Sequence, residues 1–325
     1  MASSTQHPVR TAVLAVGAVG AAAAVWGIGI ERHLYTLRRH TVAVLAPGSA
    51  PIRVLHISDV HMAPWQRRKQ AWIASLASLR PDLIINTGDN LGHPDAVRGI
   101  RAAFAGFRGI PGAFVHGPND LFASAPRNPL RYFLGPSKNH SREVRLDTEA
   151  MDSFFTSTLG WHDVNNAAAT VDVHGRRVNL VGVNDAHRNW DRLDLLPGLF
   201  DQLQAASTDL DGDGLADPEA DPHPLTVAVT HAPYRRVLDA FTGAGADVIF
   251  GGHTHGGQVR VPGFGALVAN CDIPLKQASG LSSWHRLGHT AALNVSAGLG
   301  HSIYAPVRFA CPPEASLLTL VAREA

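Results

Sequence analysis

Two histidines, His253 and His255, stand one residue apart in the stretch Gly251–Gln258, GGHTHGGQ, directly after the apolar run Val248–Phe250. In extended backbone, side chains alternate between two faces, so both imidazoles point to the same side of the chain. The flanking glycines let the backbone pass close to a ligand, and imidazole is the commonest metal ligand in proteins. The stretch therefore predicts a metal site, with a plain glycine-rich turn as the alternative.

Other strand-like apolar runs also end at Asp, Asn or His side chains. In open α/β sheets, ligands bind beyond the carboxyl ends of the strands, so these chain segments can meet at one point. Oxygen and imidazole donors together suit divalent metals such as Mn²⁺, Fe²⁺ or Zn²⁺. The set is too large for one tetrahedral zinc and fits two metals that share a carboxylate. The candidate ligands are Asp59, His61, Asp89, Asn119, His231, His253 and His255.

The elements that position these residues alternate between strands and helices. Short apolar runs predict the strands, and a helical spacing of apolar residues predicts the helices between them. This alternation is typical of parallel βαβ units. We expect strands at 53–57, 83–85 and 113–115, and helices at 66–79 and 95–107.

Strand-like runs return in the second half of the chain. Residues 174–177 separate two of them and are typical of a hairpin turn. The C-terminal third is rich in glycine and short apolar runs, which favours a second, largely antiparallel sheet. We expect these strands at 169–173, 178–183, 225–230, 247–250, 293–296 and 316–321.

Composition limits the function classes. The chain has 325 residues, which is enough for one large core or two small ones, and its net charge is +1. It has no block dense in Lys and Arg, so nothing indicates a nucleic-acid polymer as a partner. Cys271 and Cys311 are too few for a disulfide framework and lack zinc-site spacing, and whether they pair is left open. The oligomeric state is also left open.

The N-terminal segment favours a membrane anchor. Thr11–Ile30 contains twenty residues without a charge, and as a helix it would span about 30 Å, the thickness of the hydrocarbon core. A cleaved signal peptide is the main alternative, because Ala22–Ala24 resembles a cleavage site. However, the apolar run is longer than the roughly 7–15 residues of a signal-peptide core. We expect a single-pass anchor at residues 1–31, a linker at 32–51 and one domain at 52–325.

The charges around this segment bear on its orientation. Arg10 precedes the apolar run, whereas Arg32, Arg38 and Arg39 follow it. Positive charges collect on the cytoplasmic side of membrane helices. The count slightly favours a cytoplasmic catalytic domain.

The motifs in chain order resemble the calcineurin-like metallophosphoesterase superfamily. They are Asp59-x-His61, Gly88-Asp89, Gly117-Pro118-Asn119-Asp120, a lone strand-end His231 and Gly252-His253-x-His255. With the N-terminal apolar segment, the chain is most similar to the membrane-associated branch that contains UDP-2,3-diacylglucosamine pyrophosphatase-like enzymes. The resemblance covers roughly residues 52–320. It implies a four-layer α-β-β-α sandwich of two mixed sheets, here preceded by one transmembrane helix.

The resemblance also implies a site and a reaction. A hydroxide between two metal ions (Mn, Fe or Zn) would attack the phosphorus of a phosphoester or pyrophosphate, in a substrate that is lipid- or nucleotide-linked. Asp89 would bridge the two metals. The first metal would be held by Asp59, His61 and His255, and the second by His231, His253 and an asparagine from the third strand end.

The third motif departs from the family form, which is Gly-Asn-His-Asp or Gly-Asn-His-Glu. A strict alignment puts Pro118 at the ligand position, and a shift of one residue would make Asn119 the ligand. We expect the shift, and we expect Asn119 and Asp120 to act with Asp89 in catalysis. No histidine remains in the motif to protonate a leaving group. A metal-binding regulatory protein with little turnover is therefore the alternative function.

Two other histidines are candidates to replace the missing one. His116 and His187 follow strand-like runs, and together with Asn184 they are the expected substrate-binding residues. An ordinary strand-end histidine is the alternative for His116. An ordinary turn is the alternative for Asn184–His187, because Asn-Asp is also turn chemistry.

Two segments interrupt the pattern of strands and helices. Residues 124–149 form a polar insertion, which is either a loop or a lid over the site. Residues 207–224 form an acidic loop in which Asp209–Asp217 has the acidic spacing of a calcium loop. Ala220 stands where such a loop has its bidentate Glu, so a solvated loop and a weak calcium site both remain open.

Overall fold

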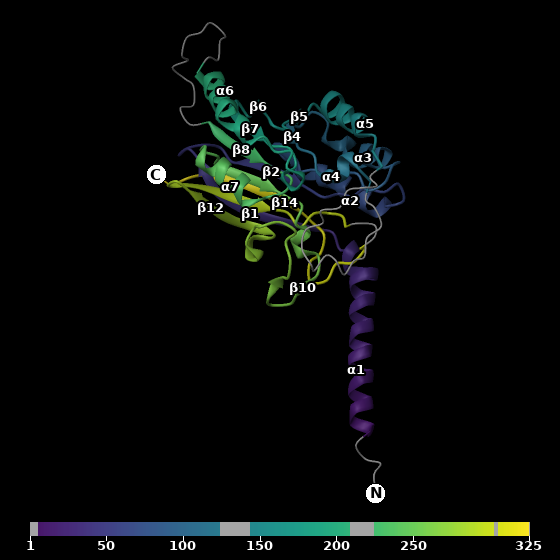
Figure 1. Cartoon of the computed structure of the whole chain (residues 1–325). Helices are drawn as coiled ribbons and strands as arrows, with labels where there is room; N and C mark the ends of the chain where they lie inside the picture. Colours follow the sequence, from purple (N-terminus) through teal and green to yellow (C-terminus); the bar gives the residue numbers. More distant parts are fainter. Residues whose placement is uncertain (1–5, 124–143, 209–223, 302–304, 325) are drawn as a thin grey trace.

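The computed structural model describes residues 6–123, 144–208, 224–301 and 305–324. Two six-stranded sheets pack face to face, and helices cover their outer faces, which confirms the predicted α-β-β-α sandwich of two mixed sheets (Figure 1). Most of the predicted insertion 124–149, and the calcium-like loop 209–217, lie outside the described residues.

The first sheet contains the predicted βαβ units. Strands β2, β3 and β4 are parallel, and α2 (Arg67–Ser75) and α3 (Val97–Phe104) connect them across its outer face. Strand β14 pairs antiparallel with β2 and parallel with β1, so the sheet is mixed. In spatial order its strands are β1 (Thr36–Leu45), β14 (Glu314–Ala322), β2 (Ile52–Ile57), β3 (Leu83–Asn86), β4 (Gly112–Phe114) and β5 (His162–Asp163).

The second sheet is also mixed, so the expectation that it is largely antiparallel is wrong. Strands β7, β8, β9 and β13 run parallel, because α6 (Leu196–Thr208) and α7 (Arg235–Gly243) carry the chain from β7 to β8 and from β8 to β9. Only the two outer pairs are antiparallel, including the predicted β6–β7 hairpin. In spatial order its strands are β12 (Gly280–Arg286), β13 (His289–Val295), β9 (Val248–Gly251), β8 (Leu225–Val229), β7 (Arg176–Gly182) and β6 (Ala167–Val173).

The core follows from the two-residue period of the strands. Val54 and Ile85 pack between the two sheets, whereas their neighbours Leu55 and Ile84 pack beneath the helices on the outer face. The second sheet repeats the pattern on its own outer face, beneath α6 and α7. Both faces of the central strands are therefore apolar, and polar groups are concentrated where the strands end. The shorter α-helices and strands are α4 (Pro118–Leu121), α5 (Thr148–Ser153), β10 (Arg260–Val261) and β11 (Gly265–Ala266).

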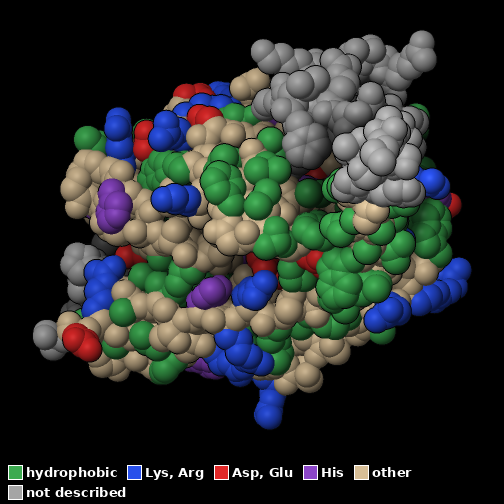
Figure 2. Space-filling view, turned by 90° about the horizontal axis from the view of Figure 1, so that it is seen from below, with side chains coloured by type: hydrophobic (Ala, Val, Ile, Leu, Met, Phe, Trp, Pro, Cys, Tyr) green, Lys and Arg blue, Asp and Glu red, His purple; other side chains and the backbone are tan. Residues whose placement is uncertain are grey.

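The N-terminal helix extends away from the domain (Figure 1). Helix α1 (Gln6–Ala24) continues through a π-helical turn (Val25–Ile30) into a short 3₁₀ turn (Glu31–His33). The span Arg10–His33 contains an 18-residue window with a mean hydropathy of 2.1, and only 6% of that window is buried. It is long and apolar enough to cross a membrane, a property that a signal sequence shares. Figure 2 views the molecule from the side of α1 and shows hydrophobic, Lys and Arg side chains on this face.

The segment 32–51 is not a plain linker, in contrast to the prediction. It contains β1, the edge strand of the first sheet, which pairs with β14 along its whole length. Val42 and Leu45 pack between the sheets, and Arg38 forms an ion pair with Glu314 at 3.0 Å. The strand was missed because its partner lies about 280 residues away in the sequence, and its polar residues resemble a linker.

Candidate metal centre

The candidate ligands lie at one edge of the sandwich, where strands of both sheets end. Asp59 and His61 follow β2, Asp89 follows β3, and His231, His253 and His255 follow β8 and β9. The backbone turns sharply at these positions, because five of the ligands have left-handed φ values that are uncommon for residues other than glycine. These values are Asp59 48°, His61 41°, Asp89 54°, His253 64° and His255 48°. Such conformations cost energy and cluster at functional sites.

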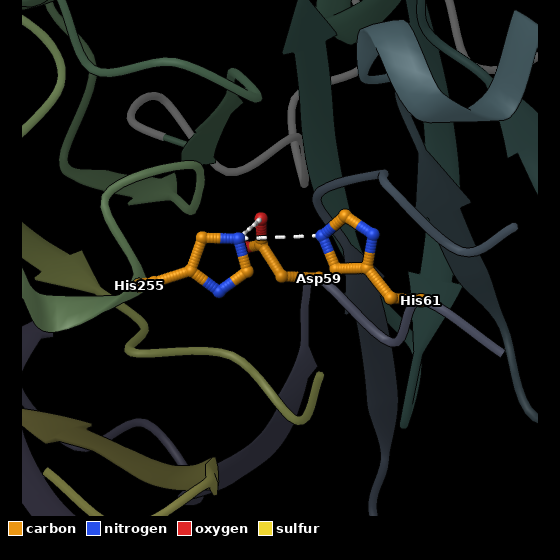
Figure 3. Close-up of side chains that lie close together, drawn as sticks. All are labelled: Asp59, His61 and His255. Carbon is orange, nitrogen blue, oxygen red and sulfur yellow. Dashed lines mark hydrogen bonds and ion pairs between the residues drawn. The ribbon is translucent and has the colours of Figure 1, made fainter. Parts of the chain in front are cut away.

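The first group of ligands is Asp59, His61 and His255, whose ligand atoms lie within 4.8 Å of one another (Figure 3). His255 Nε2 is 3.6 Å from Asp59 Oδ1 and 3.3 Å from His61 Nε2. Among the described residues, Asp59 Oδ1 has no hydrogen-bond partner although it is buried. A buried carboxylate oxygen without a partner, facing two imidazole nitrogens, fits a divalent cation.

The second group is Asp59, Asp89 and His231, again with ligand atoms within 4.8 Å. Asp89 Oδ2 lies 3.6 Å from His231 Nε2 and 3.5 Å from His61 Nε2. One oxygen of Asp89 therefore faces a histidine of each group. His253 Nδ1 is 3.3 Å from His231 Nε2, which brings the sixth candidate ligand to the same place.

Burial changes the pKa values of the histidines and carboxylates in this cluster. It lowers the pKa of His61, His253 and His255 well below the usual value, which leaves neutral imidazoles with lone pairs for a metal. Burial also raises the pKa of Asp89 to about 7. His231 differs: burial opposes its charged form, but Asp89 and other nearby carboxylates raise its pKa to about 9. A divalent metal would stabilise the charged form of these buried carboxylates.

The tautomer of His231 suits a metal ligand. Its Nδ1 donates to the carbonyl oxygen of Thr87 at 2.7 Å, so Nε2 is directed at Asp89. Orientation of a ligating histidine by a backbone carbonyl is common around metals. The loop after β3 therefore supplies Asp89 and also orients His231.

Asn119 stands beside the cluster. Its Nδ2 donates to Asp89 Oδ2 at 2.6 Å, and its backbone N–H donates to Asp89 Oδ1 at 2.8 Å. Pro118 is the first residue of α4, and a Cβ at Gly117 would lie 2.6 Å from His231 Cε1, so only glycine fits there. Asn119 is close enough to act at the second group, and its assignment as a metal ligand stays a prediction.

Asp120 is buried beneath the cluster. Its two carboxylate oxygens accept hydrogen bonds from the backbone N–H groups of Asp89, Asn90, Leu91 and Gly117, at 2.6 to 3.2 Å. These contacts hold the loop that carries Asp89. They are the contacts of a positioning residue, although Asp120 was predicted to act in catalysis.

The two histidines that could replace the missing one, His116 and His187, have different surroundings in the structure. His116 contacts Asp152 through Nε2 at 2.8 Å and Asn165 through Nδ1 at 3.1 Å, so both ring nitrogens are engaged away from the cluster. The ring of His187 lies 4.5 Å from that of His253, and its Nδ1 is 3.0 Å from the hydroxyl of Tyr234. His187 is therefore the histidine next to the candidate metal centre.

Asn184 makes the contacts of a turn. Its side-chain oxygen accepts a hydrogen bond from the N–H of Asp185 at 2.7 Å, and its own N–H donates to Asn166 Oδ1 at 3.0 Å. Asp185 in turn caps the short helical turn that carries His187. This segment positions His187, and the role of Asn184 in substrate binding stays a prediction.

A buried chain of hydrogen bonds behind Asp59 was missed by sequence reasoning. It runs from Asn294 in the second sheet through His56, Thr87 and Ser58 to Asp59 Oδ2, with distances of 2.8, 3.0, 2.6 and 2.5 Å. The backbone N–H of His253 also donates to Asp59 Oδ2, at 2.9 Å. One oxygen of Asp59 is thus fixed, and the other remains for a metal. A histidine inside an apolar strand was the available signal.

A second missed residue is Arg308, whose side chain is fully buried. Its guanidinium donates to the carbonyl oxygens of Ala297, Gly298 and Gly300 at 2.6 to 3.2 Å. A Cβ at Gly298 would lie 2.5 Å from the Asp59 Cβ. Arg308 therefore holds a glycine-containing loop against the ligands, and no motif marked it.

Two overlapping groups of carboxylates and histidines, at the strand ends of an α/β sandwich, have the donor atoms that could hold divalent metal ions. The chain belongs to the calcineurin-like phosphoesterase family, whose model matches residues 52–257, and it is therefore a metal-dependent phosphoesterase. The family match confirms the resemblance to calcineurin-like phosphoesterases that the sequence motifs indicated. No curated protein matches the sequence.

Solved structures resemble the chain at low sequence identity. A 5′-nucleotidase precursor from Thermus thermophilus has 14% identity and a TM-score of 0.40, covering 84% of this chain and 55% of that one. The NAD nucleotidase of Haemophilus influenzae has 11% identity and a TM-score of 0.42, covering 77% and 51%. A dimetal phosphatase from Danio rerio has 11% identity and a TM-score of 0.37, covering 76% and 88%. The chain thus spans about half the length of the first two.

Proposed function

We propose that this phosphoesterase uses two divalent metal ions and is held at a membrane by α1. The observation that carries the proposal is the position of Asp89 Oδ2, which faces His61 of one ligand group and His231 of the other. Asp59, His61 and His255 would hold the first ion. Asp89 would contribute to both, and His231 and His253 would hold the second. The donor set suits Mn, Fe or Zn.

When bound, two such ions lower the pKa of water and neutralise charge on the phosphoryl group. The protein supplies the remaining functions. Asp120 and Thr87 fix the positions of Asp89 and His231. Asn119 presents an amide beside Asp89, where it can hydrogen-bond a phosphoryl oxygen. His187, next to His253, takes the role of proton donor to the leaving group, in place of the histidine missing from the third motif.

The substrate we propose is a lipid- or nucleotide-linked phosphoester or pyrophosphate. The span Arg10–His33 supports a site close to a bilayer, because it is apolar and almost wholly outside the domain. The argument for a cytoplasmic domain rests on the arginines after this span. It is weakened by Arg38, which lies in β1 and pairs with Glu314.

The test uses the full-length chain in detergent micelles supplied with Mn²⁺. Hydrolysis of bis-p-nitrophenyl phosphate and p-nitrophenyl phosphate is measured together with metal content, with Asp89→Asn as the matched variant. We expect about two metals per chain and turnover of at least one ester. The variant should lose metal and on the order of 10²–10⁴-fold in rate, because the metals supply several kcal/mol of charge stabilisation.

Two outcomes would contradict the proposal. Metal binding without hydrolysis of either ester would favour the regulatory metal-binding protein, in which Pro118 and Asn119 have removed turnover. Full activity of Asp89→Asn, with metal retained, would show that the ligand groups have been misassigned.

A further inference from the structure

The loop that follows the metal ligands ends in an exposed apolar tip. Strands β10 (Arg260–Val261) and β11 (Gly265–Ala266) form a small hairpin whose turn is Pro262-Gly263-Phe264. The Phe264 side chain is 75% exposed and that of Val261 is 45% exposed. From Val261 to Cys271 the sequence carries no charged residue. A protruding, uncharged tip with a large exposed aromatic side chain indicates a contact surface.

The base of this hairpin is tied to the π-helical and 3₁₀ turns that follow α1, Val25–Ile30 and Glu31–His33. The connecting segment is Val307–Cys311. Its Phe309 exchanges backbone hydrogen bonds with Gln258 and Arg260 at 3.0 and 2.9 Å, at the start of the hairpin. On either side of Phe309, the N–H of Arg308 donates to Gly27 O at 3.1 Å and that of Ala310 donates to Glu31 Oε2 at 3.0 Å.

The junction between α1 and the domain is closely packed. A Cβ at Gly27 would lie 2.9 Å from the carbonyl oxygen of Arg308. Glu31 is buried, and its carboxylate also accepts from the N–H of Cys311 at 2.6 Å and from Trp26 Nε1 at 2.6 Å. The hairpin and the end of α1 are therefore held by one short segment, and a membrane that contains α1 must lie close to the hairpin.

The hairpin and α1 also lie on the same side of the domain. In Figure 1 the β10 hairpin extends downward beside the upper end of α1, which leaves the domain in that direction. Figure 2 views this face and shows hydrophobic side chains with Lys and Arg among them. Positive charge beside an apolar surface suits anionic lipid headgroups.

We propose that the tip of the β10–β11 hairpin, centred on Phe264, inserts into the headgroup region of the bilayer that contains α1. This inference rests on the membrane anchoring proposed above. The bilayer is the favoured occupant because the tip is uncharged and is fixed to the end of a span of membrane length. Only residues 256–259 separate His255 from the start of the hairpin at Arg260, so the second contact would hold the metal centre at a set height and orientation above the lipid surface.

The experiment uses the full-length chain in vesicles of phosphatidylcholine and phosphatidylglycerol that contain doxyl-labelled lipids. Three single variants, Val16→Cys, Phe264→Cys and Leu287→Cys, are labelled with bimane, and the unmutated chain is labelled in parallel to measure the background from Cys271 and Cys311. Quenching of bimane by the doxyl lipids reports contact with the bilayer. Val16 lies within α1 and tests the anchor.

Leu287 is the matched control, because it is also a hairpin-tip residue and its side chain is 78% exposed. It lies in the β12–β13 turn, before the start of β13. Strand β13 is parallel to β9, and the candidate ligands His253 and His255 follow the carboxyl end of β9. Leu287 precedes β13, so it lies at the end of the sheet opposite to these ligands.

We expect strong quenching at positions 16 and 264 and no more than background at 287, with at least about a twofold difference between the two hairpin tips. Quenching at 16 without quenching at 264 would overturn the hairpin proposal and leave the anchor intact. Absence of quenching at 16 would remove the anchor, and the inference with it. Disulfide cross-linking between two unlabelled Phe264→Cys chains, without quenching at 264, would instead assign the tip to contact with a second copy.

Discussion

The two oxygens of Asp59 are used differently. Oδ2 accepts hydrogen bonds from the Ser58 hydroxyl and the His253 N–H, whereas buried Oδ1 has no hydrogen-bond partner among the described residues. The protein therefore fixes the rotation of this carboxylate before any metal binds. Supporting hydrogen bonds of this kind are commonly as important to a metal site as the ligands themselves.

Ser58→Ala should weaken metal binding while the fold is retained. The substitution removes the 2.5 Å hydrogen bond to Asp59 Oδ2 and leaves the carboxylate free to rotate. We expect affinity for Mn²⁺ to fall about 10–100-fold, measured by competition with a chelator. Ser78→Ala, at an exposed serine, is the control and should bind metal normally. Unchanged affinity for Mn²⁺ in Ser58→Ala would show that the other contacts of Asp59 suffice to hold its carboxylate in position.

His187→Asn should distinguish substrates by their leaving groups. A proton donor matters most for a poor leaving group, so hydrolysis of an alkyl phosphoester should fall about 10²–10⁴-fold, while the p-nitrophenyl ester changes little. Metal content should stay constant, which separates this effect from loss of a ligand. Tyr234→Phe removes the hydroxyl 3.0 Å from His187 Nδ1 and should cause a smaller loss of the same kind. Equal losses for both esters would exclude the proton-donor role.

Sequence reasoning recognised residues by type and spacing near the strand ends. Asp59, His61 and His255 come together as expected because residues at parallel strand ends share one edge. His56 and Arg308 were missed for a different reason. Their roles depend on which buried atoms they reach in three dimensions, and no local spacing encodes that.

At the scale of elements, His56 links the two sheets. It lies within β2, and its ring contacts Asn294 of β13 and Thr87 after β3; among the described residues it has no charged partner. Burial lowers its pKa to about 3. Because His56 stays neutral inside β2 in the folded protein, it makes the stability of the sandwich depend on pH.

His56 should lower the free energy of unfolding of the domain as pH falls from about 6.5 toward 3. The unfolded chain protonates His56 near its usual pKa of 6.5, whereas the folded chain keeps it neutral to about pH 3, so acid favours unfolding. His56→Gln removes this dependence. Its free energy of unfolding should fall less steeply with decreasing pH, by up to about 1.4 kcal/mol per pH unit. Denaturant titrations of the full chain in detergent with EDTA, at several pH values, measure this, and identical slopes would contradict the argument.

The elements predicted correctly are those whose signal is local. Strands β2, β3 and β4, with α2 and α3 between them, show apolar runs and helical spacing within short windows. Strand β1 was missed, and the strand directions of the second sheet were wrong, because both depend on pairing between distant segments.

At the scale of the whole molecule, buried Glu31 joins the apolar helix to the domain. Glu31→Ala removes the acceptor for Trp26 Nε1 and for the N–H groups of Ala310 and Cys311. Each hydrogen bond to a charged group is worth about 1.5–3 kcal/mol, so the junction should open more often. We expect faster hydrogen exchange at residues 307–311 in Glu31→Ala. Exposed Glu149→Ala is the control, and unchanged exchange would mean that the junction rests on packing alone.

Strand β14 lies between β1 and β2, although it comes last in sequence among the described strands. During synthesis, β1 and β2 leave the ribosome early, but neither can gain its final neighbour until Glu314–Ala322 has been translated. The facing edges of β1 and β2 must therefore stay unpaired until β14 has been made. The order of translation therefore makes completion of this sheet a late step, in which β14 inserts between two strands made earlier.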